Sequence, residues 1–282
     1  MSAAPVDDAA LAAQLVGLQT SRYFTVAGSA ILVFDYCITF NSEVRWVWGR
    51  TWDLTRIMFT ISRYVAFVAT LMTLYAAVEP RVGENCIPFG HASTATHLIS
   101  IISAEALLIM RTYAFWHGER KVLYGLLMLG AACVLGSVCI SAFVNPGQTP
   151  NALPSSPGCI FESSRSSAYQ YIFLVLFETA LLGLTLYKRF VHYRGSTSSM
   201  IATLYRDGVQ YISCIILLSI INIIVDAIVP IGYSNVMDAP QIVTHSVLAS
   251  RILFSLRRNH ANTVQQDFTT TTFFLNALNS PL

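Results

Sequence analysis

The sequence predicts an all-α fold, an integral membrane bundle of seven transmembrane helices. Apolar residues make up 54% of the 282-residue chain and charged residues only 11%, well below the roughly 25% of charged residues in soluble domains. Seven apolar stretches divide the chain, and each is long enough to cross a bilayer as a helix. The 17 Lys and Arg residues are also sorted between alternate connections, which is typical of a multi-pass protein.

The expected spans are, in order, 23–41, 56–78, 91–112, 121–144, 168–190, 208–229 and 239–256. A helix rises 1.5 Å per residue, so about 20 residues cross the hydrocarbon. Helix is the expected form because its backbone groups hydrogen-bond within the segment. Nine of the 10 prolines lie outside the seven spans, and Pro240 is the second residue of the last one. Pro80 follows the second span, Pro146 the fourth and Pro230 the sixth, as expected of a residue that stops helices.

These spans divide the chain into an external N-terminal segment at 1–22, a seven-helix domain at 23–256 and a cytoplasmic tail at 257–282. The first segment carries Asp7 and Asp8 and lacks the basic stretch and cleavage site of a signal peptide. The first span is therefore expected to act as the insertion signal. The tail is rich in Thr and Asn and is expected to be disordered, because such a composition buries little apolar surface.

The basic residues predict the orientation. With the N-terminus external, thirteen lie on the cytoplasmic side, three lie outside, and Arg63 lies within a span. The opposite orientation would place thirteen cations outside, against the positive-inside rule. We therefore expect a cytoplasmic C-terminus, in the plasma membrane or a membrane of the secretory pathway. The cytoplasmic set is Arg45, Arg50, Arg56, Arg111, Arg120, Lys121, Lys188, Arg189, Arg194, Arg206, Arg251, Arg257 and Arg258.

Two cysteines lie in connections assigned to the external side. Cys86 precedes the third span, and Cys159 lies in a Pro-, Gly- and Ser-rich connection at about 145–167. Two cysteines on one oxidising face favour a disulfide bond, with two free thiols as the alternative. The other cysteines lie within spans, where Cys behaves as a small apolar packing residue.

Charged residues inside spans are costly and are therefore candidates for functional sites. Asp35, Arg63 and Glu105 each lie six or seven residues from the cytoplasmic end of a span, at one depth of about 10 Å inside that boundary. A guanidinium can pair with two carboxylates, so the three side chains are expected to form an intramembrane ion network. This network would either fix helix packing or act as a switch whose pairs rearrange between two states.

A second polar group lies nearer the external side. Asn222 and Asp226 share one face of the sixth span at i, i+4, and His97, Glu178 and His245 come from the third, fifth and seventh spans. These residues are expected to line a pocket open to the outside, for a ligand or a metal ion. The alternative is interhelical hydrogen bonding. Because the sequence has no histidine box or H-E-x-x-H motif, no metal site and no cofactor are predicted.

The sequence excludes several functions. A retinal protein needs a Schiff-base lysine in its last span, whereas Lys121 and Lys188, the two lysines, lie at cytoplasmic ends. The chain has no P-loop, nucleophile elbow or dinucleotide fingerprint, and no basic arm for nucleic acid. Glu105, Glu178 and Asp226 leave open an intramembrane enzyme that acts on a lipid or isoprenoid through buried carboxylates.

The segment from Tyr23 to Tyr64 carries a distinctive set of residues, Phe34-Asp35-Tyr36, Thr39, Glu43, Trp48, Trp52 and Arg63-Tyr64. This set resembles the N-terminal signature of a large fungal family, abundant in mushroom-forming fungi, of multi-pass membrane proteins catalogued as a domain of unknown function. The chain departs from the signature with Phe34 in place of the first Tyr and Asn41 in a usually acidic region. The resemblance extends to Arg111-Thr112-Tyr113-Ala114 and to Arg251 with Leu256-Arg257. It implies a seven-helix protein and supplies no substrate.

The plan of the chain is also similar to that of a G-protein-coupled receptor, which is an analogy at the level of the fold. Arg111-Thr112-Tyr113 lies where such receptors carry an acidic-Arg-aromatic triplet, although Met110 replaces the acid. The leading expectation is receptor-like sensing of an external small or lipidic ligand, with membrane lipids and a cytoplasmic coupling partner as further partners. The alternatives are the intramembrane enzyme and a structural membrane protein without a ligand.

Overall fold

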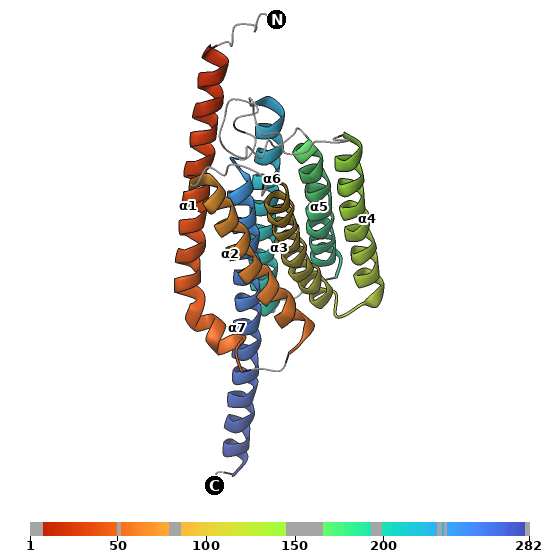
Figure 1. Ribbon diagram of the computed structural model, residues 1–282. Coiled ribbons are helices and arrows are strands. Elements are labelled where there is room, and N and C mark those ends of the chain that lie inside the picture. The colour runs from red at the N-terminus through yellow and green to blue at the C-terminus, as the bar shows by residue number, and fades with distance from the viewer. Residues whose placement is uncertain are drawn as a thin grey trace, which may run out of the picture.

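The computed structural model of the chain describes residues 8–49, 52–78, 86–144, 166–192, 199–229, 233 and 236–279. These ranges contain seven α-helices and no β-strand, which confirms the predicted all-α class. The helices are α1 (Asp8–Trp46), α2 (Leu54–Val78), α3 (Cys86–Phe115), α4 (Arg120–Val144), α5 (Ser166–His192), α6 (Ser199–Ile228) and α7 (Asp238–Asn279). They run alternately up and down, so that α1 begins at one end of the bundle and α7 leaves at the other (Figure 1). We call these the N-terminal end and the C-terminal end.

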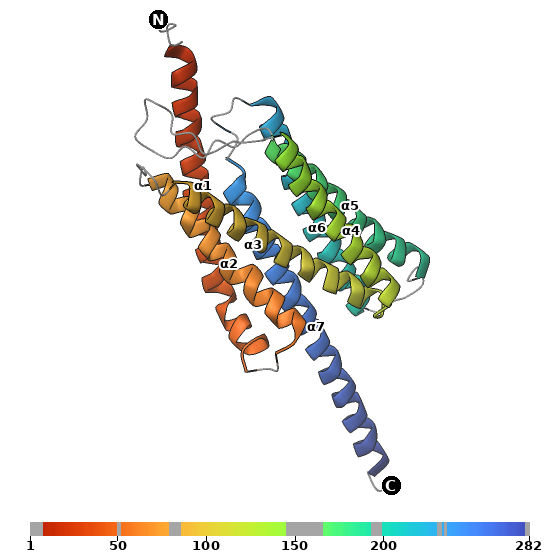
Figure 2. The ribbon, with the colours of Figure 1, turned by 45° about the vertical axis from the view of Figure 1, so that its right-hand side comes forward.

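α7 lies at the centre of the bundle, where it packs against α1, α2, α3 and α6. α1 and α2 lie on one side of α7, and α4, α5 and α6 lie on the other (Figure 2). α4 is peripheral and packs against α5 and α3. Side chains of α7 therefore meet residues from most of the other helices, and this position determines where the polar sites form.

Six of the described helices contain segments that are long and apolar enough to cross a membrane. Large apolar side chains cover their outer faces, and Phe34, Leu71 and Met128 are 65%, 65% and 72% exposed. Apolar surface of this extent is expected against lipid and not against water. The structure thus supports a multi-pass membrane protein whose outer helices contact lipid. The six segments are Leu15–Trp46, Leu54–Val78, Pro88–Phe115, Arg120–Ile140, Ala168–Val191 and Gly208–Ile228.

α7 differs from these six because it buries polar side chains. Gln241, His245, Ser246 and Ser250 are each at most 1% exposed. The surrounding helices keep these side chains away from lipid, and a bundle interior offers hydrogen-bond partners to polar groups. α7 is therefore less apolar than the six candidate spans because it lies at the centre of the bundle, where its side chains face other helices.

Two helices are longer than the sequence predicts. α1 begins at Asp8, so most of the predicted N-terminal segment is helical, and α7 continues to Asn279, through the tail predicted to be disordered. The structure gives helix as far as Asn279, and the disorder expected at 257–282 stays a prediction. Neither Gly nor Pro occurs between Pro240 and Pro281, so no residue that breaks helices ends α7 earlier. Hydropathy locates the part of a helix that lies in hydrocarbon, not the ends of the helix.

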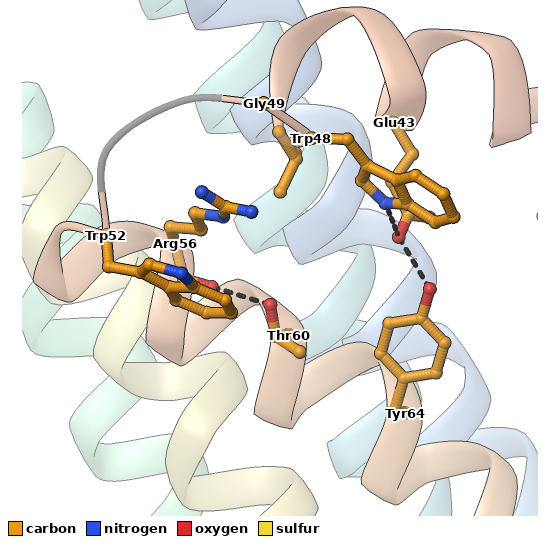
Figure 3. Close-up of a pocket in the computed structure, with 8 residues that line it drawn as sticks. Glu43, Trp48, Gly49, Trp52, Arg56, Thr60 and Tyr64 are labelled. Carbon is orange, nitrogen blue, oxygen red and sulfur yellow. Dashed lines mark hydrogen bonds between the residues drawn. The ribbon is translucent and has the colours of Figure 1, made fainter.

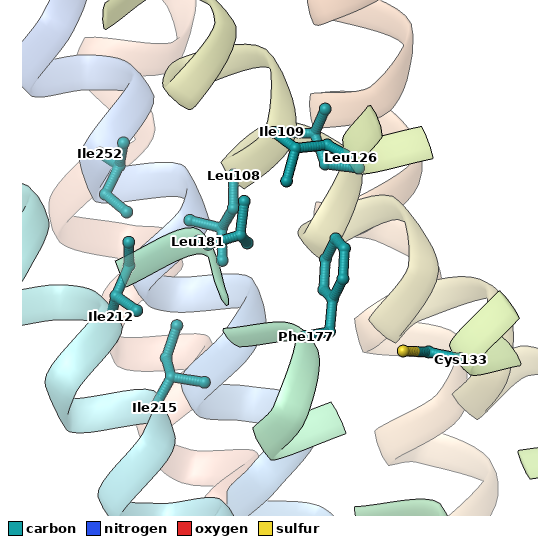
Figure 4. Packing of buried hydrophobic residues seen from close by; sticks show 9 residues of the cluster. All are labelled: Leu108, Ile109, Leu126, Cys133, Phe177, Leu181, Ile212, Ile215 and Ile252. Atoms are coloured by element: carbon teal, nitrogen blue, oxygen red, sulfur yellow. The ribbon is translucent and has the colours of Figure 1, made fainter. Parts of the chain in front are cut away.

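A layer of buried aliphatic side chains crosses one half of the bundle (Figure 4). It belongs to the larger cluster that joins α3 to α7, and each member discussed here is at most 4% exposed. We call this layer the apolar floor, because a group of polar residues lies on its N-terminal side, as described below. The apolar floor consists of Leu108 of α3, Leu181 of α5, Ile212 and Ile215 of α6, and Ile252 of α7.

Candidate functional site

One face of α1 carries Asp35, Thr39 and Glu43, spaced four residues apart and therefore stacked along the helix. Arg63 of α2 contacts all three side chains. Its Nη1 lies 3.8 Å from Oδ2 of Asp35, its Nε lies 2.9 Å from Oε2 of Glu43, and its Nη2 donates a hydrogen bond to Oγ1 of Thr39. Both carboxylates and the guanidinium are at least 97% buried. The four-residue spacing on α1 thus places three side chains where they bind one guanidinium.

Arg251 of α7 supplies a second cation. Its Nη2 and Nε lie 2.8 and 2.9 Å from Oδ1 of Asp35, so this pair connects α7 to α1. The sequence-based topology counts Arg251 among the cytoplasmic cations, whereas the structure places it beside Asp35, which that topology places within a span. An arginine stem is long enough to carry its charge back to such a partner. We call Asp35, Thr39, Glu43, Arg63 and Arg251 the motif network.

The motif network is balanced in charge and rich in hydrogen bonds. Two carboxylates face two guanidiniums, so the formal charge is zero. Oε1 of Glu43 also accepts hydrogen bonds from the Tyr64 hydroxyl at 2.7 Å and the Trp48 indole at 3.2 Å. Buried charges are stable only when they are paired and hydrogen-bonded. Both conditions are met for Glu43, as expected of a network that holds α1 and α2 together.

A pocket of about 340 Å³ opens beside the motif network, where α1 is connected to α2 (Figure 3). Trp48 and Trp52 form parts of its wall and are 48% and 67% exposed. The Arg56 guanidinium lies 4.0 Å from the centre of the Trp52 ring, within the range of a cation–π contact. The complete lining is Glu43, Val47, Trp48, Gly49, Trp52, Arg56, Thr60 and Tyr64. Exposed indoles at this end are typical of a membrane interface.

Glu105 is not part of the motif network, although the sequence predicts it there. Its Oε1 lies 3.2 Å from Nδ1 of His245, and Nε2 of the same imidazole lies 3.4 Å from Oε1 of Glu178. Helical rise gives the depth of Glu105 along the membrane, but depth alone does not say which face of α3 carries the carboxylate. The structure therefore joins one residue of the predicted network to two residues of the predicted pocket.

Two further side chains complete this second site. Ser219 of α6 donates a hydrogen bond to Glu178, 3.3 Å from either carboxylate oxygen, and accepts one of 2.7 Å from Nε2 of Gln241. That amide nitrogen also lies 2.8 Å from Nε2 of His245. We call Glu105, Glu178, Ser219, Gln241 and His245 the core cluster. Glu105 is 6% exposed, and each of the other four side chains is at most 1% exposed.

The core cluster is polar on one side and closed on the other. On each of α3, α5, α6 and α7, the apolar floor lies nearer the C-terminal end than the core cluster does. Toward the N-terminal end, α6 instead presents Asn222 and Asp226, one and two turns beyond Ser219. Both lie close enough to Tyr171 to interact with its hydroxyl, and that hydroxyl donates a 2.7 Å hydrogen bond to Asp238. The polar groups thus continue only toward the N-terminal end.

Asn222 and Asp226 are buried without full hydrogen bonding. Within the part of the chain that the structure describes, neither side chain has a hydrogen-bond partner of good geometry, although they are 0% and 5% exposed. A buried polar group without a hydrogen bond costs about 1–3 kcal/mol. Such groups are expected where a ligand, an ion or water completes the site.

His97 lies apart from the core cluster. Its Nε2 is 3.0 Å from Oγ1 of Thr73 on α2, and the acid that acts on its imidazole is Asp238 of α7. Of the five residues in the predicted pocket, the structure brings Glu178 and His245 into contact and places Asn222 and Asp226 on the same side of the apolar floor. His97 lies nearer the N-terminal end, on the α2 face of α3.

Arg111 joins α3 to α6 on the C-terminal side of the apolar floor. It is 5% exposed, and a β-carbon added to Gly208 of α6 would lie 1.1 Å from its Nη2. The guanidinium therefore occupies the space that a side chain at position 208 would fill. The same two helices carry Glu105 and Ser219 of the core cluster, which are joined through His245 and Glu178, so α3 and α6 are linked directly at Arg111 and indirectly at the core cluster.

The predicted Cys86–Cys159 disulfide involves side chains that lie outside the described residues, and it stays a prediction. Among the described side chains, Cys37, Cys133, Cys139 and Cys214 are free thiols. Peptide mass mapping with and without reductant would test the bond, and two unlinked peptides would exclude it.

Sequence reasoning missed Ser219, Gln241, Arg251 and Arg111 as members of polar sites. The first two are uncharged and lie in helices with many small polar residues, so no motif distinguishes them. Arg251 carried a usable signal, because it lies six residues before Arg257 on a helix assigned to the membrane. About 9 Å of helical rise separates the two cations, which places Arg251 above the cytoplasmic end.

The fold and these two sites define a multi-pass, membrane-type helical protein with paired charges in its interior. Residues 23–68 match a family described as a family of unknown function, DUF6533. The matched segment contains the whole α1–α2 part of the motif network and the wall of the pocket in Figure 3. No curated protein and no solved structure matches the chain.

Proposed function

We propose that the chain is a receptor-like seven-helix sensor, in which the core cluster is the ligand site and the motif network is structural. The observation that carries this proposal is the excess of acid in the core cluster. Glu105 and Glu178 face one imidazole, whereas the motif network pairs two acids with two guanidiniums. A buried site with unbalanced acids has capacity for a cation or a hydrogen-bond donor.

The connection between α3 and α6 supports a route from this site to the C-terminal end. Glu105 and Ser219 belong to the core cluster, and Arg111 and Gly208 meet on the other side of the apolar floor. A ligand that changes the spacing of α3 and α6 at the core cluster would also change the fit of Arg111 against Gly208. Two packed arrangements of such helices are the usual basis of switching. We place the contact with a cytoplasmic coupling partner at these helix ends.

The proposed topology has an external N-terminus and a cytoplasmic C-terminus, with α7 as the seventh crossing, in the plasma membrane or the secretory pathway. The described cations that begin or end helices support it, because Arg45, Arg120, Lys188 and Arg206 all lie toward the C-terminal end. A single cysteine at the exposed position Arg258 should react with an impermeant maleimide only in inside-out vesicles. Reaction in right-side-out vesicles would contradict this orientation.

Two alternatives use the same residues. An intramembrane enzyme would act on a lipid or isoprenoid through Glu105, Glu178 or Asp226, and a structural protein would use the core cluster only to pack helices. The resemblance of the N-terminal segment to a fungal family of membrane proteins is compatible with all three. Turnover of a lipid or isoprenoid that disappears in a folded Glu178→Gln variant would favour the enzyme.

A distance measurement tests the sensor directly. Spin labels at positions 114 and 206, both exposed, would report the spacing of α3 and α6 at the C-terminal end by double electron–electron resonance, with all 6 cysteines replaced. Glu178→Gln imitates a neutralised, occupied site and should shift the mean distance by about 2 Å or more. Asp53→Asn, the matched change at a 55% exposed carboxylate, should leave it unchanged. Equal distances in all three proteins would contradict a sensing role.

A further inference from the structure

We infer that the core cluster binds a divalent first-row transition metal ion through Glu105, Glu178 and His245. This inference rests on the proposed function, because it names the ligand of the same site. The three residues come from α3, α5 and α7, and one ligand-type atom from each lies within 4.8 Å of the others. All three are buried, which distinguishes them from a cluster of acids on a surface.

The donor set fits such an ion. One imidazole and two carboxylates are the ligand types of zinc, manganese and iron sites. Ligand atoms around a tetrahedral zinc lie about 3.4 Å apart, given metal–ligand distances of about 2.1 Å. Glu105 lies 3.2 Å from Nδ1 and Glu178 lies 3.4 Å from Nε2 of His245, so each carboxylate faces a different nitrogen, and one ligand-type atom from each residue lies within 4.8 Å of the others. Side-chain rotations that shorten the longest of these separations by about 1.4 Å would bring both carboxylates around one ion.

Charge balance gives the strongest argument for a divalent ion. With both carboxylates ionised and His245 neutral, the three side chains carry a formal charge of −2 in the membrane interior. Neutrality then requires either two bound protons or one divalent cation. The two positive charges of an ion at one nitrogen of His245 offset both carboxylates, and the N–H at the other nitrogen can donate a hydrogen bond to the carboxylate that faces it. Metal binding therefore exchanges one M²⁺ for two protons without leaving net charge in the bundle.

Unpaired polar atoms around the triad point to the same conclusion. Gln241 is 0% exposed, and its Oε1 has no hydrogen-bond partner among the described residues. Neither carboxylate oxygen of Glu105 has a hydrogen bond there, its ion contact with His245 apart. The amide oxygen of Gln241 could accept the proton of the imidazole or ligate the ion directly, and Ser219 already orients Glu178. Such outer partners are the usual support of metal ligands.

The surroundings give the ion one direction of approach. Asp226 and Asp238 lie between the core cluster and the N-terminal end, where they attract cations, and the apolar floor closes the opposite side. The N-terminal end is the external end in the proposed topology. The structure thus describes a dead-end site for an external cation, not a path through the bundle.

Zinc titration of the full chain in lipid nanodiscs, after removal of any affinity tag, tests the inference. Isothermal titration calorimetry should show one zinc per chain, and titration in buffers of different ionisation enthalpy should show release of about two protons. Glu105→Gln, Glu178→Gln and His245→Ala should each weaken binding by at least about 100-fold, and Ser219→Ala by about 10-fold. Glu119→Gln, at a 54% exposed carboxylate, is the matched control and should bind normally.

The outcomes of this titration and of the α3–α6 distance measurement separate the metal site from the sensing role. Absence of saturable binding, or equal binding by the control and the core variants, would overturn the metal site. If zinc does not bind but Glu178→Gln still changes the α3–α6 distance, the sensor stands with a different ligand. If zinc binds and that distance never changes, the metal site stands and the sensing role falls. Glu105→Gln and Glu178→Gln test the same site as His245→Ala, so the metal site can still be tested if one of the three variants folds poorly.

Discussion

The motif network and the core cluster are both buried, both charged and both completed by α7, yet they differ in charge balance. The motif network pairs Asp35 and Glu43 with Arg63 and Arg251, and Tyr64 and Trp48 donate further hydrogen bonds. The core cluster has two carboxylates and one imidazole. A balanced site needs nothing else, whereas an unbalanced one requires protons, a cation or another ligand. On this basis we propose a structural role for the motif network and a ligand-binding role for the core cluster.

The two sites also differ in their relation to the matched family segment. Residues 23–68 include four of the five members of the motif network and no member of the core cluster. The family match therefore concerns the part of the molecule that fixes α1 against α2. The ligand site that we propose is built entirely from the later helices.

Removal of Arg63 is expected to have the largest effect. Arg63→Ala removes the cation that pairs with Glu43 and leaves Asp35 with Arg251, and breaking a buried ion pair costs about 3–5 kcal/mol. We expect the variant to accumulate poorly and to show a much lower Tm in detergent. Arg258→Ala, at an exposed position on α7, is the control. Normal accumulation and Tm for Arg63→Ala would show that the motif network does not stabilise the fold.

Removal of Arg251 should have a smaller effect. Its loss leaves no carboxylate of the motif network without a cation, because Arg63 still pairs with Asp35 and Glu43. The cost should therefore be below that of a broken buried pair, about 3–5 kcal/mol. Thermal unfolding of Arg251→Ala beside Arg63→Ala would measure the difference. An equal loss in both variants would mean that α7 contributes as much to the motif network as α2 does.

Filling the space at Gly208 should have the smallest effect on stability. The methyl group of Gly208→Ala meets the far end of the long, flexible Arg111 side chain, which can move aside without a shift of the backbone. The α3–α6 distance at positions 114 and 206 should nevertheless change, because Arg111 loses its place against α6. Gly183→Ala, where an added β-carbon meets nothing within 4 Å, should change neither Tm nor distance. An unchanged distance in Gly208→Ala would remove Arg111 from the proposed route.

The sequence predicted the helical architecture well because hydrocarbon imposes a strong pattern. Six of the seven predicted spans lie within one observed helix, and the sixth span, 208–229, passes the end of α6 by one residue. Prolines lie close to most of these limits. Pro88 and Pro240 fall in the first turns of α3 and α7, where their missing N–H groups break no helical hydrogen bond. The ends of α1 and α7 were not predictable from hydropathy, because a helix can continue into water without any change of backbone pattern.

The sites were predicted less completely, for a geometric reason. Helical rise gives the depth of Asp35, Arg63 and Glu105 but not the direction in which each side chain points. Asp35 and Arg63 lie together because α1 and α2 are neighbours, whereas Glu105 faces α5 and α7. The ligand-type residues of the core cluster come from three helices that are far apart in sequence, so no spacing motif could reveal them.

The difference between the two sites is tested most directly by one change made in each. Glu43→Gln removes a charge from the balanced motif network and should lower the free energy of unfolding by about 1–3 kcal/mol. Glu178→Gln removes a charge from the core cluster, where acid is in excess, and should leave that free energy unchanged or raise it. Both would be measured by thermal unfolding of the metal-free protein in the same nanodiscs. Equal destabilisation by the two variants would make the core cluster a second structural network and contradict our account.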